Sequence, residues 1–149
     1  MTDTSATGNY YNINAITMFT GLTDRTIRSY IASGILQGEK INGLWHFTPE
    51  QVVTFFRHPA VRPSILAKQN SLVYDFLLDG KKKDQEACII LDLPEVDPKE
   101  TSEFFCYSIN NGDFPNIRFA LDAMDGSLRV ILKGDARDVL ALANRYYER

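Results

Sequence analysis

The dipeptide Asn42-Gly43 is the feature that most restricts how the first sixty residues can fold. Both central residues of a type I′ hairpin turn need a positive φ, which asparagine and glycine adopt more readily than other residues. Counting outward from the turn pairs Ile41 with Leu44, Lys40 with Trp45, and Glu39 with His46. The sequence therefore predicts a short β-hairpin that ends at Phe47.

Two short helices are predicted before this hairpin. Asn12 can cap the first, and its apolar residues recur at helical spacing as far as Gly21. Thr23 can cap the second, which runs from residue 24 to 33 and is followed by Gly34. Two helices joined by a short turn that contains glycine are typical of a helix-turn-helix.

The second of these helices has one apolar and one polar side. The apolar side carries Ile27, Tyr30 and Ile31, and the opposite side carries Arg25, Arg28 and Ser29. A recognition helix presents basic and small polar groups in this way to phosphates and base edges. A solvated helix face is the alternative reading of the same residues.

A third helix is predicted after the hairpin. Thr48 supplies an N-cap, Pro49 suits the first helical position, and Gln51 completes a capping box. The helix ends before Pro59. The order helix, glycine turn, helix, hairpin, helix predicts a winged helix-turn-helix over residues 10–60.

The stretch from Tyr11 to Phe56 resembles the DNA-binding domain of the MerR family of bacterial transcription regulators. The matching residues are Ile13, Thr20-Gly21-Leu22-Thr23, Arg25-Thr26-Ile27-Arg28, Tyr30, Gly34-Ile35-Leu36, Gly43, Phe47-Thr48 and the helix that begins at Glu50. This resemblance implies that Arg25, Thr26 and Arg28 contact DNA from the recognition helix and that the wing contacts the backbone. The candidate DNA-binding residues are Arg25, Thr26, Arg28, Ser29, Lys40, Trp45 and His46.

The wing departs from the family pattern at one position. Trp45 stands where the family usually has an arginine, two residues before the final aromatic, and His46 follows it. Trp45 can stack on a sugar, pack as core or face solvent, and a protonated His46 can contact a phosphate.

Charge is distributed unevenly along the chain. Residues 1–70 carry six basic and four acidic residues, a net charge of +2, whereas residues 71–149 carry ten basic and fifteen acidic residues, a net charge of −5. A modestly basic module attached to an acidic one fits a DNA-binding domain and a domain that stays off DNA. Ordinary variation of surface charge explains the same numbers.

A connecting helix is predicted over residues 61–80. Its apolar residues form a broad stripe, but Gln69 and Asn70 interrupt any heptad repeat, so a long coiled coil is not expected. In position it resembles the helix through which MerR-like proteins dimerise. Direct pairing with a second copy and packing within its own chain are both open.

Residues 81–149 predict a small α+β domain with the order strand, helix, strand, strand, helix. The strand covers residues 87–93, Asp97 and Pro98 begin the helix, and Asp135 caps the last helix. The first four elements resemble a strand-helix-strand-strand module that, when duplicated, forms ligand-binding domains of some MerR-like regulators. One copy is present, and a dimer can supply the second.

Asp125-Gly126 predicts the turn of the second hairpin and fixes its register. Phe119, Leu121 and Ala123 then share an apolar face with their partners, and Asp122 lies opposite Arg129 as a favourable pair. The other face mixes charged and apolar residues and is expected to be available. Its candidate ligand or dimer residues are Arg118, Ala120, Arg129, Ile131 and Lys133, with plain solvent exposure as the alternative.

Other classes of site have little support in the sequence. No catalytic set is evident, and Cys88 and Cys106 lack metal-ligand spacing, so neither a metal nor a cofactor is expected. Residues 1–9 lack the regions of a signal peptide and are expected to be a disordered tail, and no apolar run is long enough to cross a membrane. The expectation is a cytoplasmic α+β protein that regulates transcription, is not an enzyme, and binds double-stranded DNA at an inverted repeat as a homodimer, with or without a small-molecule effector. The alternative is a protein-interaction module on a winged-helix scaffold without tight DNA binding.

Overall fold

The computed structural model describes residues 10–124 and 126–149, so the tail expected over residues 1–9 lies outside the described residues. The elements follow the chain as α2 (Ile13–Thr20), α3 (Asp24–Ala32), β1 (Glu39–Ile41), β2 (Leu44–His46), α4 (Pro49–Arg57), α5 (Arg62–Leu78), β3 (Glu86–Pro94), α6 (Pro98–Asn110), β4 (Arg118–Met124), β5 (Ser127–Asp135) and α7 (Ala136–Glu148). Helices combined with two antiparallel sheets confirm the α+β class.

The helix caps that the sequence predicts are formed. The side chain of Asn12 accepts from the backbone N–H of Ala15, and that of Thr23 accepts from the N–H of Thr26. Thr48 and Gln51 form both hydrogen bonds of a capping box. The positive φ of 72° at Gly21 closes α2, a conformation that other residues adopt only at a cost.

The β1–β2 hairpin has the register counted from Asn42-Gly43. Glu39 pairs with His46, Lys40 with Trp45 and Ile41 with Leu44. Asn42 has a φ of 53° and Gly43 a φ of 80°, the positive values that a type I′ turn requires. This prediction is confirmed.

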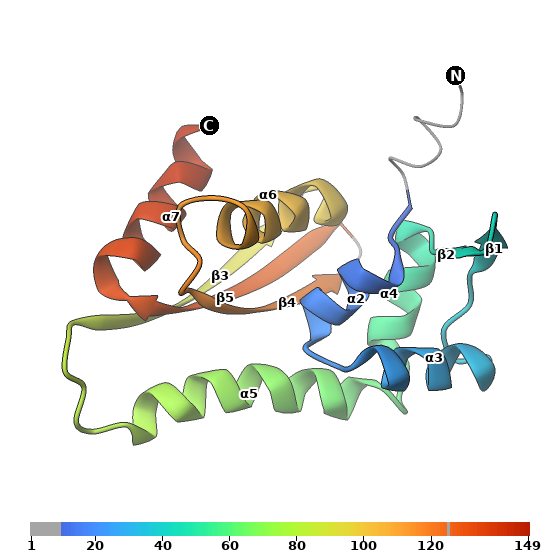
Figure 1. Ribbon diagram of the computed structural model, residues 1–149, viewed down its shortest axis with the longest axis horizontal. Helices are drawn as coiled ribbons and strands as arrows, with labels where there is room; N and C mark the ends of the chain where they lie inside the picture. Colours follow the sequence, from blue (N-terminus) through green and yellow to red (C-terminus); the bar gives the residue numbers. More distant parts are fainter. Residues whose placement is uncertain (1–9, 125) are drawn as a thin grey trace.

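The second sheet has three antiparallel strands in the order β3-β5-β4 and lies between two helical layers (Figure 1). Helices α6 and α7 cover one face, and α5 lies against the other. The predicted pairing of Phe119 with Leu132, Leu121 with Val130 and Ala123 with Leu128 is confirmed. These apolar residues belong to the main core beneath α6 and α7.

The mixed face of this sheet is not available in the way the sequence suggested. Leu72 of α5 packs on Ala120 and Ile131 in a small cluster of its own, which leaves them 9% and 2% exposed. The prediction that these two residues receive a ligand or a second copy is therefore wrong, because the connecting helix of the same chain covers them. Arg118 stays exposed at the edge of this face, whereas Arg129 and Lys133 are half-buried.

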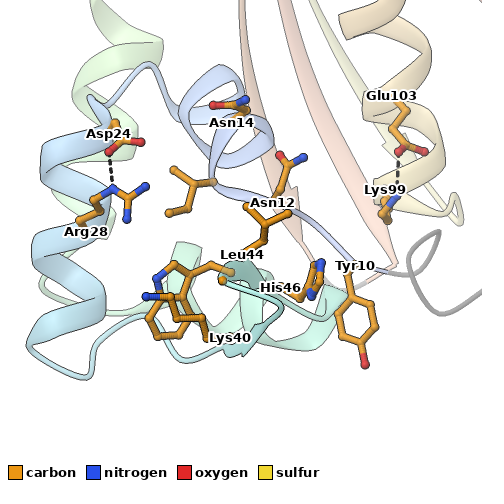
Figure 2. Close-up of a pocket in the computed structure, with 13 residues that line it drawn as sticks. Tyr10, Asn12, Asn14, Asp24, Arg28, Lys40, Leu44, His46, Lys99 and Glu103 are labelled. Atoms are coloured by element: carbon orange, nitrogen blue, oxygen red, sulfur yellow. Dashed lines mark hydrogen bonds and ion pairs between the residues drawn. The ribbon is translucent and has the colours of Figure 1, made fainter. Parts of the chain in front are cut away.

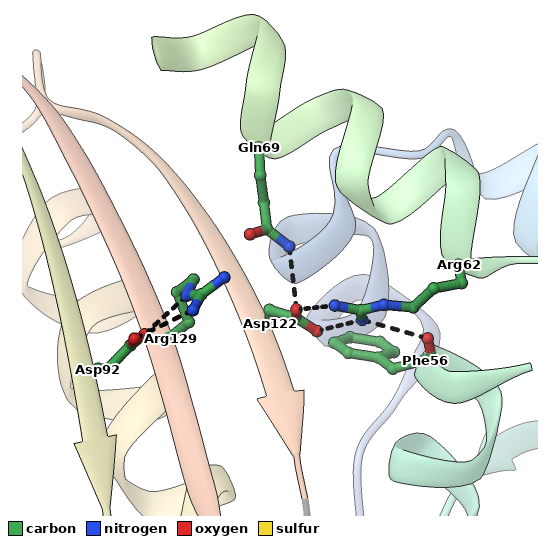
Figure 3. Close-up of polar contacts among 6 residues, drawn as sticks. All are labelled: Phe56, Arg62, Gln69, Asp92, Asp122 and Arg129. Atoms are coloured by element: carbon green, nitrogen blue, oxygen red, sulfur yellow. Dashed lines mark hydrogen bonds and ion pairs between the residues drawn. The ribbon is translucent and has the colours of Figure 1, made fainter.

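The expected ion pair between Asp122 and Arg129 is also wrong, although the two residues face each other in the register. Figure 3 shows that the Asp122 carboxylate instead accepts two hydrogen bonds from Arg62, at 2.8 and 2.6 Å, and a third from Gln69 at 3.0 Å. Arg129 turns to the neighbouring strand and donates two hydrogen bonds to Asp92. Asp122 is thus bound to α5, and Arg129 is bound to β3.

The N-terminal elements pack against the edge of the same sheet. Helices α2, α4 and α5 all contact β4. The largest core cluster is continuous from Tyr11 to Tyr146, so buried residues on both sides of the connecting helix pack together. Within the described ranges, no helix combines the length and hydropathy of a membrane span.

Asp122→Asn is expected to lower the free energy of unfolding by about 3 kcal/mol. Removing one partner of a buried ion pair costs about 3–5 kcal/mol, and the lower end applies because 29% of the Arg62 side chain remains exposed. Urea denaturation followed by circular dichroism measures the change.

Asp92→Asn is the matched control, since it breaks a similar two-bond pair with an arginine on the same sheet. Its carboxylate is 58% exposed, against 1% for Asp122. Exposed pairs contribute less than about 1 kcal/mol. Equal losses in the two variants would contradict the view that burial makes the Asp122 pair the stronger constraint.

Candidate functional site

A groove of about 750 Å³ lies where the hairpin, α2, α3 and α6 meet (Figure 2). Its walls are α3 on one side and the start of α6 on the other, and the hairpin forms its floor. The lining residues are Tyr10, Asn12, Ile13, Asn14, Asp24, Arg28, Lys40, Gly43, Leu44, Trp45, His46, Lys99 and Glu103.

Four of the seven candidate DNA-binding residues line this one groove: Arg28, Lys40, Trp45 and His46. Arg25 and Ser29 are exposed on α3 but outside the groove. Thr26 is half-buried, and its hydroxyl lies 3.0 Å from the hydroxyl of Thr23. The Thr26 side chain therefore contacts the N-cap residue of α3 and does not project from an open surface.

Helix α3 is held to the protein by few residues. Ile27 is its only fully buried residue, and Tyr30 packs its ring edge against Phe55 of α4. In Figure 1 the helix lies at the periphery, away from the three-stranded sheet. Most of its surface is thus free to contact a partner.

The charge of Arg28 is partly compensated. Its Nε donates to the Asp24 carboxylate at 2.6 Å, one helical turn earlier, and both side chains are more than half exposed. Exposed pairs at this spacing are weak, about 0.3–0.5 kcal/mol. A phosphate or another strong acceptor can therefore displace Asp24.

Trp45 is shared between the core and the groove. Its ring stacks on the buried ring of Phe47, with centroids 6.1 Å apart and planes 9° from parallel. The Lys40 ammonium lies 5.8 Å from the Trp45 ring centroid. Core packing, one of the alternatives open from the sequence, thus accounts for part of this side chain, while its remaining surface lines the groove.

His46 offers one ring nitrogen to the groove. Its Nδ1 is buried and has no hydrogen-bond partner among the described residues, and its ring lies 5.4 Å from that of Tyr10. Nε2 is therefore the nitrogen left for an occupant.

Tyr11 and Lys99 connect the hairpin to α6, which the sequence did not indicate. Tyr11 exchanges two backbone hydrogen bonds with Phe47, and its ring lies 5.5 Å from the Lys99 ammonium. Burial raises the pKa of the Tyr11 hydroxyl well above its usual value. Lys99 is itself buried and binds Glu103 at 2.7 Å. No local signal places a lysine from the second half of the chain in this groove.

The groove has a small excess of positive charge. Arg28, Lys40 and Lys99 face Asp24 and Glu103, and each of these carboxylates is already paired with a cation of the groove. Lys40 has no carboxylate within ion-pair distance in the described part of the chain. Together with the amides of Asn12 and Asn14, this arrangement suits an anionic, hydrogen-bonding partner.

Other chemistry is weakly represented. Burial raises the pKa of Cys106 to about 12 and also raises that of Cys88, so neither thiol is activated as a nucleophile. In residues 10–124 and 126–149, no three His, Cys, Asp or Glu side chains are grouped as a metal site would require.

Comparisons of the chain with protein-family models, curated proteins and solved structures found no match.

Iodide is expected to quench the fluorescence of Trp45 more strongly than caesium does. Trp45 is the only tryptophan, and the cations around it attract an anionic quencher and repel a cationic one. Lys40→Gln should reduce the preference for iodide, since this ammonium is close to the indole ring.

Lys68→Gln is the matched control, because it removes the same charge from an exposed position on α5. It should leave the quenching ratio unchanged. Equal quenching by iodide and caesium in the parent would contradict the charge excess assigned to the groove.

Proposed function

We propose that this protein is a sequence-specific DNA-binding transcription regulator of the MerR-like type. In this proposal α2 and α3 form a helix-turn-helix, the β1–β2 hairpin is the wing, and a homodimer binds an inverted repeat in the cytoplasm. Each half of the dimer contributes one recognition helix to one half-site.

The observation that carries the proposal is the convergence of α3 and the hairpin on one groove. Arg28 of α3 and Lys40 and His46 of the hairpin line it from different elements. Arg25 and Ser29 lie exposed on the same helix, which is buried only through Ile27. A protruding helix with exposed arginines, flanked by a hairpin with a lysine, is the arrangement with which winged helices contact base edges and phosphates.

The second half of the chain is assigned to dimerisation rather than to ligand binding on its mixed face. Ala120 and Ile131 are buried beneath α5 and cannot receive an effector there. A small-molecule effector therefore has no site on that face in this proposal.

An interaction module without tight DNA binding is the second candidate. Two observations favour it: Asp24 already binds Arg28, and Glu103 brings a second carboxylate into the groove. Carboxylates repel the phosphate backbone, and the whole chain has a net charge of −3.

A DNA shift assay across a range of salt concentrations separates the two candidates. Selection of bound fragments from a genomic pool first supplies the duplex. Specific binding that persists at about 0.15 M salt supports the regulator. An absence of bound fragments at this salt favours the interaction module.

Arg25→Ala and Arg28→Ala are each expected to weaken DNA binding while the fold stays intact. A base-edge contact is worth about 1–3 kcal/mol, which corresponds to about a 5- to 150-fold loss of affinity at the preferred site. A phosphate contact would instead weaken all sequences alike and reduce the salt dependence. Both side chains are exposed, so the cost in stability should be within about 0.5 kcal/mol.

Arg137→Ala is the matched control, since Arg137 is an exposed arginine in the first turn of α7 and its side chain is 91% exposed. It should bind DNA like the parent. Unchanged binding by both α3 variants would remove α3 from the DNA interface and with it the proposed function.

Asp24→Asn is expected to tighten DNA binding by a few-fold. The substitution releases Arg28 from its 2.6 Å ion pair and removes a carboxylate that repels phosphate. Fluorescence anisotropy with a labelled duplex measures the change. Weaker binding by a folded variant would mean that Asp24 positions Arg28 for its contact instead of competing for it.

A further inference from the structure

One edge and part of one face of the three-stranded sheet are left open by the helices. β3 is nine residues long and pairs only with β5, so its other edge has no strand partner among the described residues. Ile90, at its centre, is 53% exposed. Long, bare strand edges are rare in proteins that stay monomeric, because they invite pairing with another strand.

The face of β3 on the α5 side is covered at one end only. Cys88 is half-buried against the small cluster of Leu72, Ala120 and Ile131. Residues two apart share a face of a strand, so Ile90 and Asp92 point to the same side as Cys88. The cover that α5 gives to Cys88 does not extend to Ile90.

Helix α5 presents an apolar stripe beside this open face. Leu66, Val73 and Leu77 follow at spacings of seven and four residues and therefore share one side of the helix. Leu66 is 38% exposed and Leu77 is 67% exposed.

The orientation of α5 shows which way this stripe faces. The stem of Lys68 runs toward α2, where it comes within 3.4 Å of the position that a Cβ on Gly21 would occupy. The stripe lies on the other flank, and its member Val73 packs on the same cluster as Cys88. Ile90, Leu66 and Leu77 are the exposed apolar residues on this side of β3 and α5, and we call this surface the β3–α5 corner.

The backbone of β3 offers hydrogen bonds toward this open edge. The N–H of Ala136 donates to the carbonyl of Gln85 at 3.0 Å, in line with the register that pairs Glu86 with Asp135. Hydrogen bonding alternates along an antiparallel ladder. The backbone N–H and C=O groups of the odd-numbered residues of β3 therefore bond to β5, and those of the even-numbered residues point to the open edge. Pro94, which has no N–H, is one of the even-numbered residues, as expected at a sheet edge.

The sequence of β3 is compatible with itself in an antiparallel register centred on its middle residue. Centred on Ile90, a two-fold axis sets Ile90 against Ile90, Ile89 against Leu91, and Cys88 against Asp92. All nine residues are then paired, and no carboxylates face each other. A centre at Ile89 would oppose Glu86 to Asp92, and one at Asp92 would oppose two aspartates.

The same register sets no like charges opposite each other across the edge. Lys133 is the β5 partner of Cys88, and Cys88 lies opposite Asp92 of the other copy. Cys88 therefore separates Lys133 from the partner's Asp92, which its own Arg129 already binds. Arg118 is the β4 partner of Lys133.

We propose that a second copy of this chain binds at the β3–α5 corner, with the two β3 strands paired antiparallel around Ile90 in a continuous six-stranded sheet. The apolar stripes of the two α5 helices then flank the central pair of strands. The contact is isologous and closed, as a two-fold dimer requires. This inference specifies the homodimer of the proposed function and rests on that part of it.

Sedimentation of the full chain tests the interface. The parent should be dimeric at tens of micromolar, and Ile90→Lys should weaken the dimer at least tenfold because it places two like charges opposite each other. Leu140→Lys is the matched control, since Leu140 has the same 53% exposure but lies on α7. A monomeric parent, or an Ile90→Lys variant as dimeric as the parent, would overturn the proposal.

A cross-link tests the register without relying on a disruptive variant. Ile90→Cys in a Cys88→Ser background should form a disulfide between copies under mild oxidation. Outward-pointing residues that face each other have Cα atoms about 5.5 Å apart, within the range a disulfide spans. Leu140→Cys in the same background should not cross-link, and cross-linking no better at residue 90 than at residue 140 would overturn the register.

DNA binding separates this inference from the proposed function. The Ile90→Lys variant should still bind a single half-site like the parent and lose the added affinity of an inverted repeat. If the parent dimerises through Ile90 but binds no DNA, the interface stands and the regulator does not. If half-site binding persists while the parent is monomeric even on DNA, the regulator stands and this interface does not.

Discussion

The buried carboxylate of Asp122 is the constraint on which the arrangement of this molecule depends. A charge that is 1% exposed is stable only when its hydrogen-bonding capacity is met, and Arg62 and Gln69 together supply three hydrogen bonds. Both partners belong to α5, so the ion pair fixes where that helix crosses the sheet. Arg62 also donates to the carbonyl of Phe56 at the end of α4. One charge on β4 therefore locates the connecting helix and the last helix of the N-terminal unit.

The position of α5 explains which surfaces are covered and which are bare. Held at β4 by Asp122, the helix lies over β4 and β5 and buries Ala120 and Ile131. Since β4 and β3 are opposite edges of the sheet, a helix held at β4 does not cover Ile90 on β3, which is 53% exposed. The face of β3 at Ile90 is thus left open as a consequence of where the carboxylate sits.

The sequence predicted features that depend on neighbours in the chain. Caps at Asn12, Thr23 and Thr48 and both hairpin registers depend on a few consecutive residues, and they were predicted correctly. The partner of Asp122 was not predicted correctly. The sequence alone does not distinguish Arg129, its cross-strand neighbour, from Arg62, which is sixty residues earlier. Lys99 entered the groove unforeseen for the same reason: its neighbours indicate only the first turn of a helix. Non-local packing decided both cases.

Continuity of the core links the proposed DNA-binding surface to the proposed dimer interface. Because α2, α4 and α5 all pack on β4 in one cluster, rotation of the helix-turn-helix relative to the sheet would expose buried apolar surface. In the proposed dimer the two sheets join rigidly through their β3 strands. The separation of the two α3 helices is then set by strand pairing at one end and by packing on β4 at the other, with no flexible hinge between them. Such a dimer would discriminate between operators by half-site spacing as well as by base sequence.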